Sequence, residues 1–143
     1  MNFLELYDIS ERFIDIINPS SPEKLITVGT HLRLRDGSRV LDFGCGYAEP
    51  LLLWAENFGC GGIGVELRPA VCERARAKIA ERGMSDRIEI VCGKGSEYEF
   101  EPHSFDAVTC IGASFVWSGY REALQVLRRA VADDPSLRTA LLK

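Results

Sequence analysis

Two glycines and two carboxylates in the first half of the chain have a spacing that could bind a nucleoside. The stretch VLDFGCGYAEP places Asp42, Gly44 and Gly46 directly at the end of an apolar run. Glycines at such a turn let a ligand approach backbone N–H groups at the start of a helix. Glu66 ends the next apolar run, where a carboxylate can accept both ribose hydroxyls of an adenosine. The four residues together predict a nucleoside site.

The residues around the glycines discriminate between nucleotides. Glu49 stands where the dinucleotide fingerprint G-x-G-x-x-G needs its third glycine, which disfavours NAD, and the chain has no G-x-x-x-x-G-K-[S/T] phosphate loop. Asp42 would repel a pyrophosphate but could attract an α-ammonium group, directly or through water. A ligand with adenosine at one end and an amino acid at the other fits both carboxylates. This combination predicts S-adenosylmethionine as the cofactor.

Alternating strands and helices are expected to position these residues. The apolar runs span residues 39–43, 62–65, 88–91 and 105–111, and the helical patterns between them span 47–58, 69–82 and 120–132. Nearly continuous apolar strands that alternate with helices indicate a parallel sheet covered on both faces. The predicted fold is α/β, a Rossmann-like, doubly wound and mostly parallel sheet of four or five strands, the fifth over residues 137–142.

The first 35 residues carry two further helical patterns, over residues 4–17 and 22–34. We expect residues 1–35 to form a cap and residues 36–143 to form an incomplete Rossmann-like domain that binds the cofactor. The side chains available for a cap over the cofactor, which could equally serve ordinary helix packing, are Tyr7, Phe13 and His31.

Residues 36–132 resemble the N-terminal two-thirds of a class I S-adenosylmethionine-dependent methyltransferase. The first motif of that family, [D/E]-x-G-x-G-x-G, stands here as Asp42-x-Gly44-x-Gly46-x-Ala48, and the acid that ends the second strand corresponds to Glu66. The stretch FDAVTCIGA matches the motif of the fourth strand. The stretch CIGASFVWSGYREALQVLRRAV is similar to small bacterial methyltransferases of the YjhP-like kind.

This resemblance implies an enzyme that transfers a methyl group from S-adenosylmethionine to a small-molecule acceptor. The residues expected against the cofactor are Asp42, Phe43, Gly44, Cys45, Gly46, Glu66, Leu67, Gly95, Ser96 and Ile111. Many family members have Gly-Asp-Ala after the third strand, where this chain has Gly93-Lys94-Gly95. Because Lys94 cannot accept a hydrogen bond, adenine would be held by backbone groups or by Ser96.

Family members usually continue through further strands, so we expect the chain to be C-terminally short for this family. The alternative function is therefore a truncated, non-catalytic domain that binds S-adenosylmethionine or regulates a partner. A sheet that ends at its fourth or fifth strand has an uncovered edge, which predicts a homodimer formed through that edge.

No catalytic residue is assigned, because methyl transfer mainly requires alignment of the reactants and no acid–base dyad is visible. Cys45 and Cys110 are expected to be buried filler, since a nucleophilic thiol needs a nearby base or cation. Asp106 falls early in its strand and is expected to have a structural role. The aromatic residues that could wall a substrate pocket, with core packing expected for one or two of them, are Phe115, Trp117 and Tyr120.

Composition narrows the class of protein. A length of 143 residues fits one domain, and a net charge of −4 without a basic run argues against a nucleic-acid partner. The acids near the N-terminus argue against a signal peptide, and no stretch is apolar for long enough to span a membrane. Five singly placed cysteines are typical of reduced thiols, and two distant histidines argue against a metal site. We therefore expect a cytoplasmic protein with a small-molecule substrate.

Overall fold

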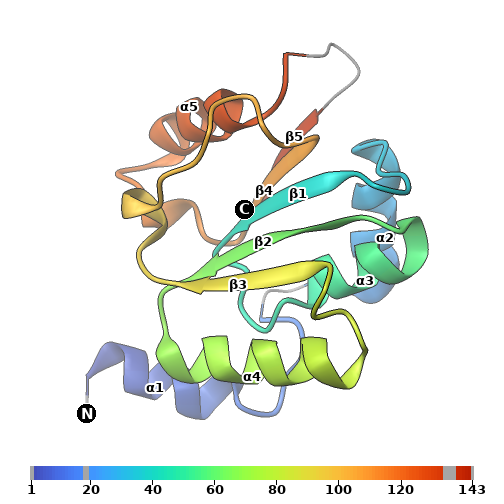
Figure 1. Cartoon of the computed structure of the whole chain (residues 1–143). Coiled ribbons are helices and arrows are strands. Elements are labelled where there is room, and N and C mark those ends of the chain that lie inside the picture. Colours follow the sequence, from blue (N-terminus) through green and yellow to red (C-terminus); the bar gives the residue numbers. More distant parts are fainter. Residues whose placement is uncertain (1, 18–19, 134–137, 143) are drawn as a thin grey trace.

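The sheet at the centre of the chain has five strands in the order β3-β2-β1-β4-β5 (Figure 1). The computed structural model describes residues 2–17, 20–133 and 138–142. The strands are β1 (Arg39–Phe43), β2 (Gly61–Glu66), β3 (Ile88–Cys92), β4 (Ala107–Ile111) and β5 (Arg138–Leu142). All neighbouring strands are parallel. The predicted doubly wound parallel sheet is confirmed, although Leu137, the expected first residue of the last strand, lies outside the described residues.

The helices agree with the expected elements to within a few residues over most of the chain. They are α1 (Phe3–Glu11), α2 (Pro22–His31), α3 (Glu49–Phe58), α4 (Pro69–Glu81) and α5 (Tyr120–Ala130), with short 3-10 turns η1 (Gly95–Glu97) and η2 (Ser114–Val116). Ser21 caps α2 and Pro22 begins it, as expected. Gly83, just beyond α4, has the left-handed φ of 66° that ends a helix.

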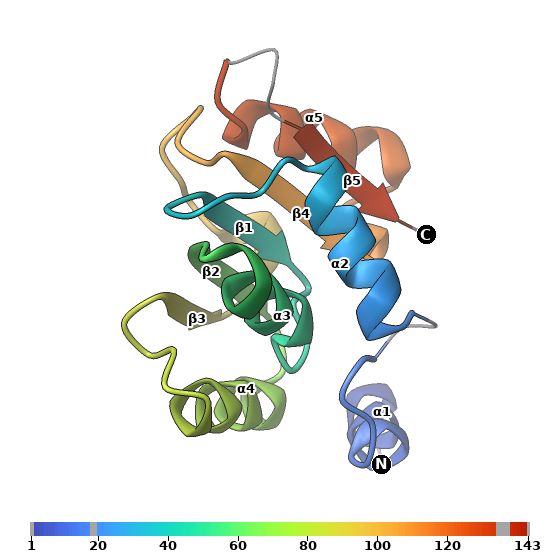
Figure 2. The same cartoon turned by 90° about the vertical axis from the view of Figure 1, so that its right-hand side faces the viewer.

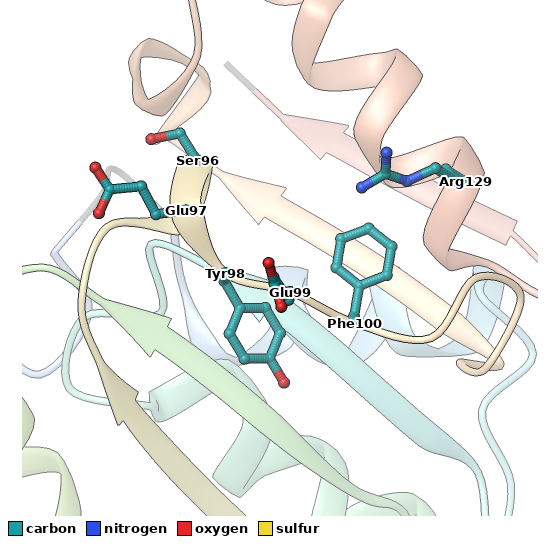
Figure 3. Close-up of a pocket in the computed structure, with 6 residues that line it drawn as sticks. All are labelled: Ser96, Glu97, Tyr98, Glu99, Phe100 and Arg129. Atoms are coloured by element: carbon teal, nitrogen blue, oxygen red, sulfur yellow. The ribbon is translucent and has the colours of Figure 1, made fainter.

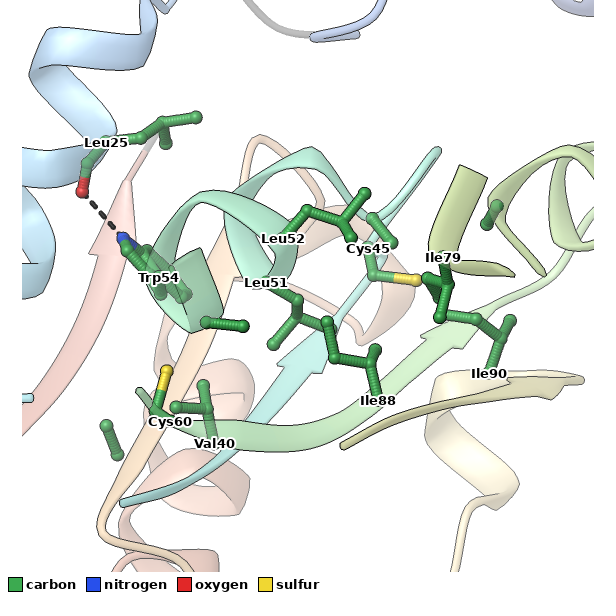
Figure 4. Packing of buried hydrophobic residues seen from close by; sticks show 14 of the residues in the cluster. Leu25, Val40, Cys45, Leu51, Leu52, Trp54, Cys60, Ile79, Ile88 and Ile90 are labelled. Carbon is green, nitrogen blue, oxygen red and sulfur yellow. Dashed lines mark hydrogen bonds between the residues drawn. The ribbon is translucent and has the colours of Figure 1, made fainter. Parts of the chain in front are cut away.

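Helices cover both faces of the sheet, and each face has its own core. Helices α2, α3 and α4 pack on one face, where Leu25, Trp54 and Ile88 belong to one buried cluster (Figure 2). The indole Nε1 of Trp54 donates to the Leu25 carbonyl oxygen at 2.7 Å, which joins α2 to α3 inside this cluster (Figure 4). Helix α5 covers the other face, where Leu41 and Leu127 belong to a second buried cluster.

The strand order creates a switch point at the carboxyl ends of β1 and β4. The chain proceeds from β1 to β2 and β3 on one side, and then returns to pair β4 with the other side of β1. At such a reversal the connections leave in opposite directions and open a crevice beyond the strand ends, which is where ligands bind in open α/β sheets. The loop after β1 and the turn η2 after β4 flank this point.

The N-terminal helix is shorter than the helical pattern over residues 4–17 predicts. Helix α1 ends at Glu11, and the chain then follows an irregular path along α4. The Arg74 guanidinium of α4 donates to the carbonyl oxygens of Arg12 and Ile14. These carbonyls are therefore satisfied by a tertiary contact in place of a continued helix, which local periodicity cannot reveal.

Among the helices in the described part of the chain, none is both long enough and apolar enough to cross a membrane. The five cysteines, Cys45, Cys60, Cys72, Cys92 and Cys110, are all free thiols.

Candidate cofactor site

The loop between β1 and α3 lies in close contact with two other parts of the chain, at Ile17 and at Ala113. Gly44 has a left-handed φ of 69°, and its N–H donates to the Val65 carbonyl oxygen at 2.8 Å. A Cβ atom on Gly44 would lie 2.4 Å from the Cβ of Ala113, and one on Gly46 would lie 2.8 Å from Cδ1 of Ile17. At Gly44 the neighbour is a Cβ atom that cannot rotate away, whereas at Gly46 the end of the Ile17 side chain could move and it is the left-handed φ of 56° that favours glycine. We call residues 44–46 the glycine loop.

Glu66 lies at the tip of β2 with its carboxylate directed at the glycine loop. The N–H of Gly46 donates to Glu66 Oε2 at 3.1 Å, and the N–H and Nε of Arg68 donate to Oε1 at 3.0 and 3.2 Å. The residue is 7% exposed. The structure therefore brings together Glu66 and the glycine loop, as the sequence predicts for a nucleoside site.

Asp42 lies beside the glycine loop, but its side chain is buried between the sheet and the helices that cover it. The alternation of β1 directs Asp42 to the same face as Val40, which helices α2 to α4 cover. Thr109 lies opposite Asp42 in the β1–β4 register, and its Oγ1 donates to Asp42 Oδ1 at 2.6 Å. Burial raises the pKa of the Asp42 carboxyl from 3.8 to about 7, the hydrogen bond from Thr109 opposes this rise, and the Glu66 charge adds to it.

Three further residues expected against the cofactor have side chains that are buried in the two cores. Phe43 is fully buried on the other face, where its ring meets that of Trp117 at a centroid distance of 4.9 Å. Cys45 and Ile111 are also buried, as members of the first core cluster. Leu67 is different, because it follows β2 and is 47% exposed.

The residues after β3 lie on the α5 side of the sheet. Gly95 lies beside Phe43 and η2, since a Cβ atom on it would be 3.2 Å from Phe43 Cδ1 and 2.9 Å from Val116 Cγ1. Ser96 is on the wall of an open hollow of about 620 Å³ that extends past Phe100 to Arg129 (Figure 3). Lys94 is exposed and pairs with Glu97 at 2.9 Å, so it is directed to solvent and not into the crevice.

Several other candidates have structural roles. Cys45 and Cys110 are buried, and burial raises the pKa of both thiols, that of Cys110 to about 12. Asp106 accepts a hydrogen bond from the N–H of Arg39 at 2.7 Å, as expected for a structural residue at a strand start. Trp117 packs on Phe43, whereas Phe115, in the turn η2 after β4, is 81% exposed.

The capping side chains proposed from the sequence are exposed. Tyr7 and Phe13 are 43% and 83% exposed, and His31 at the end of α2 is also exposed. The contact between the N-terminal segment and the glycine loop is made instead by Ile17, whose role the sequence analysis did not predict.

The sequence analysis also missed other residues of the site, and each of them binds a partner that is distant in the sequence. Thr109 binds Asp42 from 67 residues away, and Arg68 Nη1 binds Glu11 Oε2 at 2.8 Å from 57 residues away. One signal was available, because Thr109 is a polar residue inside an otherwise apolar strand. No comparable pattern marks Glu11.

Glu49 occupies the third-glycine position of the dinucleotide fingerprint but makes a structural ion-pair cluster. Its buried carboxylate accepts from Lys78 Nζ at 2.7 Å and from Arg82 Nη2 at 3.0 Å, and so joins the start of α3 to α4. Lys78 also pairs with Asp15 at 2.8 Å, which attaches the N-terminal segment to the same helix.

We expect Glu49→Gln to destabilise the fold without changing the cofactor site. The amide retains the size of the carboxylate but leaves Lys78 and Arg82 without their shared negative charge, so the free energy of unfolding should fall by about 2 kcal/mol. Urea denaturation measures this loss, and calorimetric titration should show ligand affinity within about twofold of the unchanged chain. A variant of normal stability that binds ligand poorly would contradict the structural role.

No metal site is found in the parts of the chain that the structure describes, since no three His, Cys, Asp or Glu side chains gather closely enough to hold an ion.

Comparisons with protein families, with curated proteins and with solved structures give consistent matches. The family model for a methyltransferase domain matches residues 40–134. The Escherichia coli (strain K12) protein YjhP is 30% identical over 131 residues, which are 92% of this chain and 52% of that protein. A methyltransferase from Thiobacillus denitrificans, solved in complex with S-adenosyl-L-homocysteine, superimposes with a TM-score of 0.89 at 30% identity, covering 99% of this chain and 56% of that one.

A second solved methyltransferase, from Geobacter sulfurreducens and also in complex with S-adenosyl-L-homocysteine, has a TM-score of 0.88 at 31% identity. The match covers 96% of this chain and 54% of that one. The chain thus spans about half the length of these relatives.

Proposed function

This chain belongs to the class I S-adenosylmethionine-dependent methyltransferases, and from that premise we propose that it binds S-adenosylmethionine at the glycine loop and transfers its methyl group to a small-molecule acceptor. The observation that carries the proposal is the hydrogen bond between Gly46 and Glu66 at the carboxyl ends of β1 and β2, next to the switch point of the sheet. It holds a carboxylate suited to ribose against a loop whose two glycines have no side chains and whose Cys45 side chain is buried in the core.

The residues present fit this cofactor. Glu66 Oε2 accepts a hydrogen bond from Gly46, and a carboxylate oxygen can accept a second one, here from a ribose hydroxyl. Leu67 provides an exposed apolar surface for the adenine, and the backbone of Gly95 and Ser96 supplies polar groups beside it. Asp42 is proposed to attract the ammonium group of the amino-acid end, which requires that its carboxyl be ionised.

The remaining proposed contacts follow from the placement of the strand ends. Phe43, Cys45 and Ile111 would contribute backbone atoms, and Gly44 would leave room for the ligand to approach. Residues 1–35 are proposed as the cap and residues 36–143 as the cofactor-binding domain. Helix α2 is the fixed part of this cap, since Leu25 is packed in the core.

The acceptor is proposed to be a small molecule with an apolar part. Phe13 and Phe115 are 83% and 81% exposed, and they belong to the two segments that enclose the glycine loop. The net charge of −4 supports an acceptor other than a nucleic acid. The free thiols support a cytoplasmic location. The β5 edge is proposed as the surface through which two copies pair.

The protein residues would contribute to the reaction by alignment and exclusion of water. When bound, S-adenosylmethionine supplies an electrophilic methyl group, so the chain needs mainly to hold the acceptor in line with it. Glu66 and the glycine loop would fix the nucleoside end, and exposed aromatic side chains would desolvate the acceptor. No residue of this site is assigned as a base.

Calorimetric titration with S-adenosylmethionine and S-adenosylhomocysteine tests the proposal. The unchanged chain should bind both, and Glu66→Gln should weaken binding about 30-fold, as expected for loss of about 2 kcal/mol of hydrogen bonding to a charged group. NAD serves as the control ligand and should not bind. Absence of binding to both sulfur ligands would overturn the proposed function. Binding without methyl transfer to any of a panel of small acceptors would favour the non-catalytic alternative.

A further inference from the structure

Two cysteines lie next to Glu66 at the carboxyl end of the sheet. Cys92 is the last residue of β3, and it pairs with Glu66 in the parallel register of β2 and β3. Cys72 is in the first turn of α4, and its Sγ donates to the Glu66 carbonyl oxygen at 3.3 Å. The same oxygen accepts from the N–H of Gly93 at 2.9 Å. The Cys72 thiol is thus one carbonyl oxygen away from the peptide group that follows Cys92.

The side chains of both cysteines lie on the same face of the sheet. Strand alternation directs Cys92 to the side of Ile88 and Ile90, which belong to the first buried cluster, under α2 to α4. Cys72 belongs to this cluster as well. Burial raises the pKa of the Cys72 thiol to about 12, and its hydrogen bonding with the Cys92 side chain adds to the rise. The two thiols are therefore direct neighbours between α4 and β3.

The two thiols differ in their access to solvent. Cys92 is exposed at the end of its strand, whereas Cys72 is fully buried and stays protonated at neutral pH. An accessible thiol beside a second thiol is typical of redox-sensitive pairs, in which the accessible sulfur is oxidised first and the neighbour resolves it. The other three cysteines, Cys45, Cys60 and Cys110, are buried. Cys92 is therefore the thiol that an oxidant in solution reaches first.

We propose that Cys72 and Cys92 form a reversible disulfide that lowers the affinity of the chain for S-adenosylmethionine. The disulfide itself is independent of the proposed function, whereas its effect on affinity rests on that function. Hydrogen peroxide oxidises the Cys92 thiol to a sulfenic acid and is reduced to water. The Cys72 sulfur then attacks the Cys92 sulfur, and the sulfenic hydroxyl leaves as water with the Cys72 proton. A dithiol reductant reverses the bond by thiol–disulfide exchange.

The bond acts on two segments that flank the proposed cofactor site. An S–S bond is about 2.05 Å long, so the first turn of α4 and the end of β3 must approach each other from hydrogen-bonding distance. This approach takes the Cys72 thiol away from the Glu66 carbonyl and shifts Leu67, which lies between β2 and α4. Glu66 and Leu67 are the residues proposed to hold the nucleoside. The oxidised chain should therefore bind the cofactor more weakly.

Treatment with hydrogen peroxide tests the disulfide. After the peroxide is removed and the remaining thiols are alkylated, mass spectrometry of a proteolytic digest should find Cys72 linked to Cys92, and dithiothreitol should release the link. In Cys72→Ala the Cys92 sulfenic acid should persist and react with dimedone, because its resolving thiol is gone. A link between Cys72 and Cys45, or an oxidised Cys92 that stays unlinked in the unchanged chain, would overturn the proposal.

Calorimetric titration tests the effect on the cofactor site. Peroxide treatment should lower the affinity of the unchanged chain for S-adenosylhomocysteine about tenfold, and dithiothreitol should restore it. Cys92→Ser should bind like the reduced chain both before and after treatment. The matched control is Cys60→Ala, which removes a buried thiol at the amino end of β2 and should respond to peroxide as the unchanged chain does.

The outcomes distinguish the two proposals. If the reduced chain binds no S-adenosylhomocysteine, the proposed function fails, and mapping of the disulfide still tests the thiol pair. If the reduced chain binds but no disulfide forms, or if Cys92→Ser loses affinity on oxidation as the unchanged chain does, the redox proposal is overturned. A disulfide that forms without a change in affinity would overturn its effect on the cofactor site.

Discussion

Replacing Gly44 with valine is expected to abolish binding of S-adenosylhomocysteine, with a loss of at least about 100-fold. The φ of 69° at this residue is one that side chains rarely adopt, and a Cβ atom would lie 2.4 Å from the Cβ of Ala113. Relief of this collision must move either the glycine loop or the residues after β4, and both flank the proposed ligand. Circular dichroism should report a folded chain, and calorimetric titration should report the loss of binding.

A matched variant distinguishes the collision from backbone strain. Gly37 has a φ of 79°, but a Cβ atom there would have no neighbour within 4 Å. Gly37→Val should therefore cost about 1–2 kcal/mol of stability and leave binding unchanged. If Gly44→Val does not fold, Gly44→Ala provides the smaller test of the same contact. Unchanged affinity in a folded Gly44 variant would mean that the ligand binds elsewhere.

Replacing Asp42 with asparagine is expected to stabilise the chain at alkaline pH, by up to about 4 kcal/mol near pH 8. Burial raises the pKa of Asp42 from 3.8 to about 7, so the folded chain binds this proton more tightly than the unfolded chain. The free energy of unfolding therefore falls as pH rises from about 4 to about 7, and it falls no further on account of Asp42 above that range. An asparagine keeps an acceptor for Thr109 and never ionises.

Denaturation curves at several pH values measure this effect. The difference between Asp42→Asn and the unchanged chain should approach zero near pH 4, where both side chains are neutral, and Asp86→Asn at an exposed site should show no comparable trend. A variant that is less stable by the same amount at every pH would show that the ionised carboxylate supports the fold.

The same variant tests the proposed role of Asp42 in binding. An ammonium group is attracted to the ionised carboxylate, so affinity for S-adenosylhomocysteine should rise about tenfold from about pH 6 to about pH 8 in the unchanged chain. Asp42→Asn should remove this dependence. A dependence that persists in the variant would assign it to another group.

The sheet was predictable because its strands carry their own signals. The bounds of β1 agree with the prediction at both ends, since its apolar run is delimited by the turn at Asp36-Gly37 and by Gly44. Glycines and an acid at fixed positions after such strands also placed the candidate site. These signals are local, because each depends on residues within about one loop of one another.

The features that were missed depend on long-range contacts. The end of α1 at Glu11 is set by side chains of α4, and the burial of Asp42 depends on its pairing with Thr109, 67 residues away. The environment that raises the pKa of Asp42 exists only after β1 and β4 have paired. A single sequence contains both partners but nothing that identifies them as partners.

The parallel register of β1 also has a consequence for how the chain is made. Its partner β2 and the next strand, β3, follow within the next 50 or so residues, but β4, which pairs with the other edge of β1, ends only at Ile111. During synthesis from the N-terminus, the edge of β1 that pairs with β4 therefore presents unpaired backbone N–H and C=O groups until the residues up to Ile111 have left the ribosome. The central strand of the finished sheet is thus an open edge of the nascent one, where a chaperone or a neighbouring nascent chain can compete with β4.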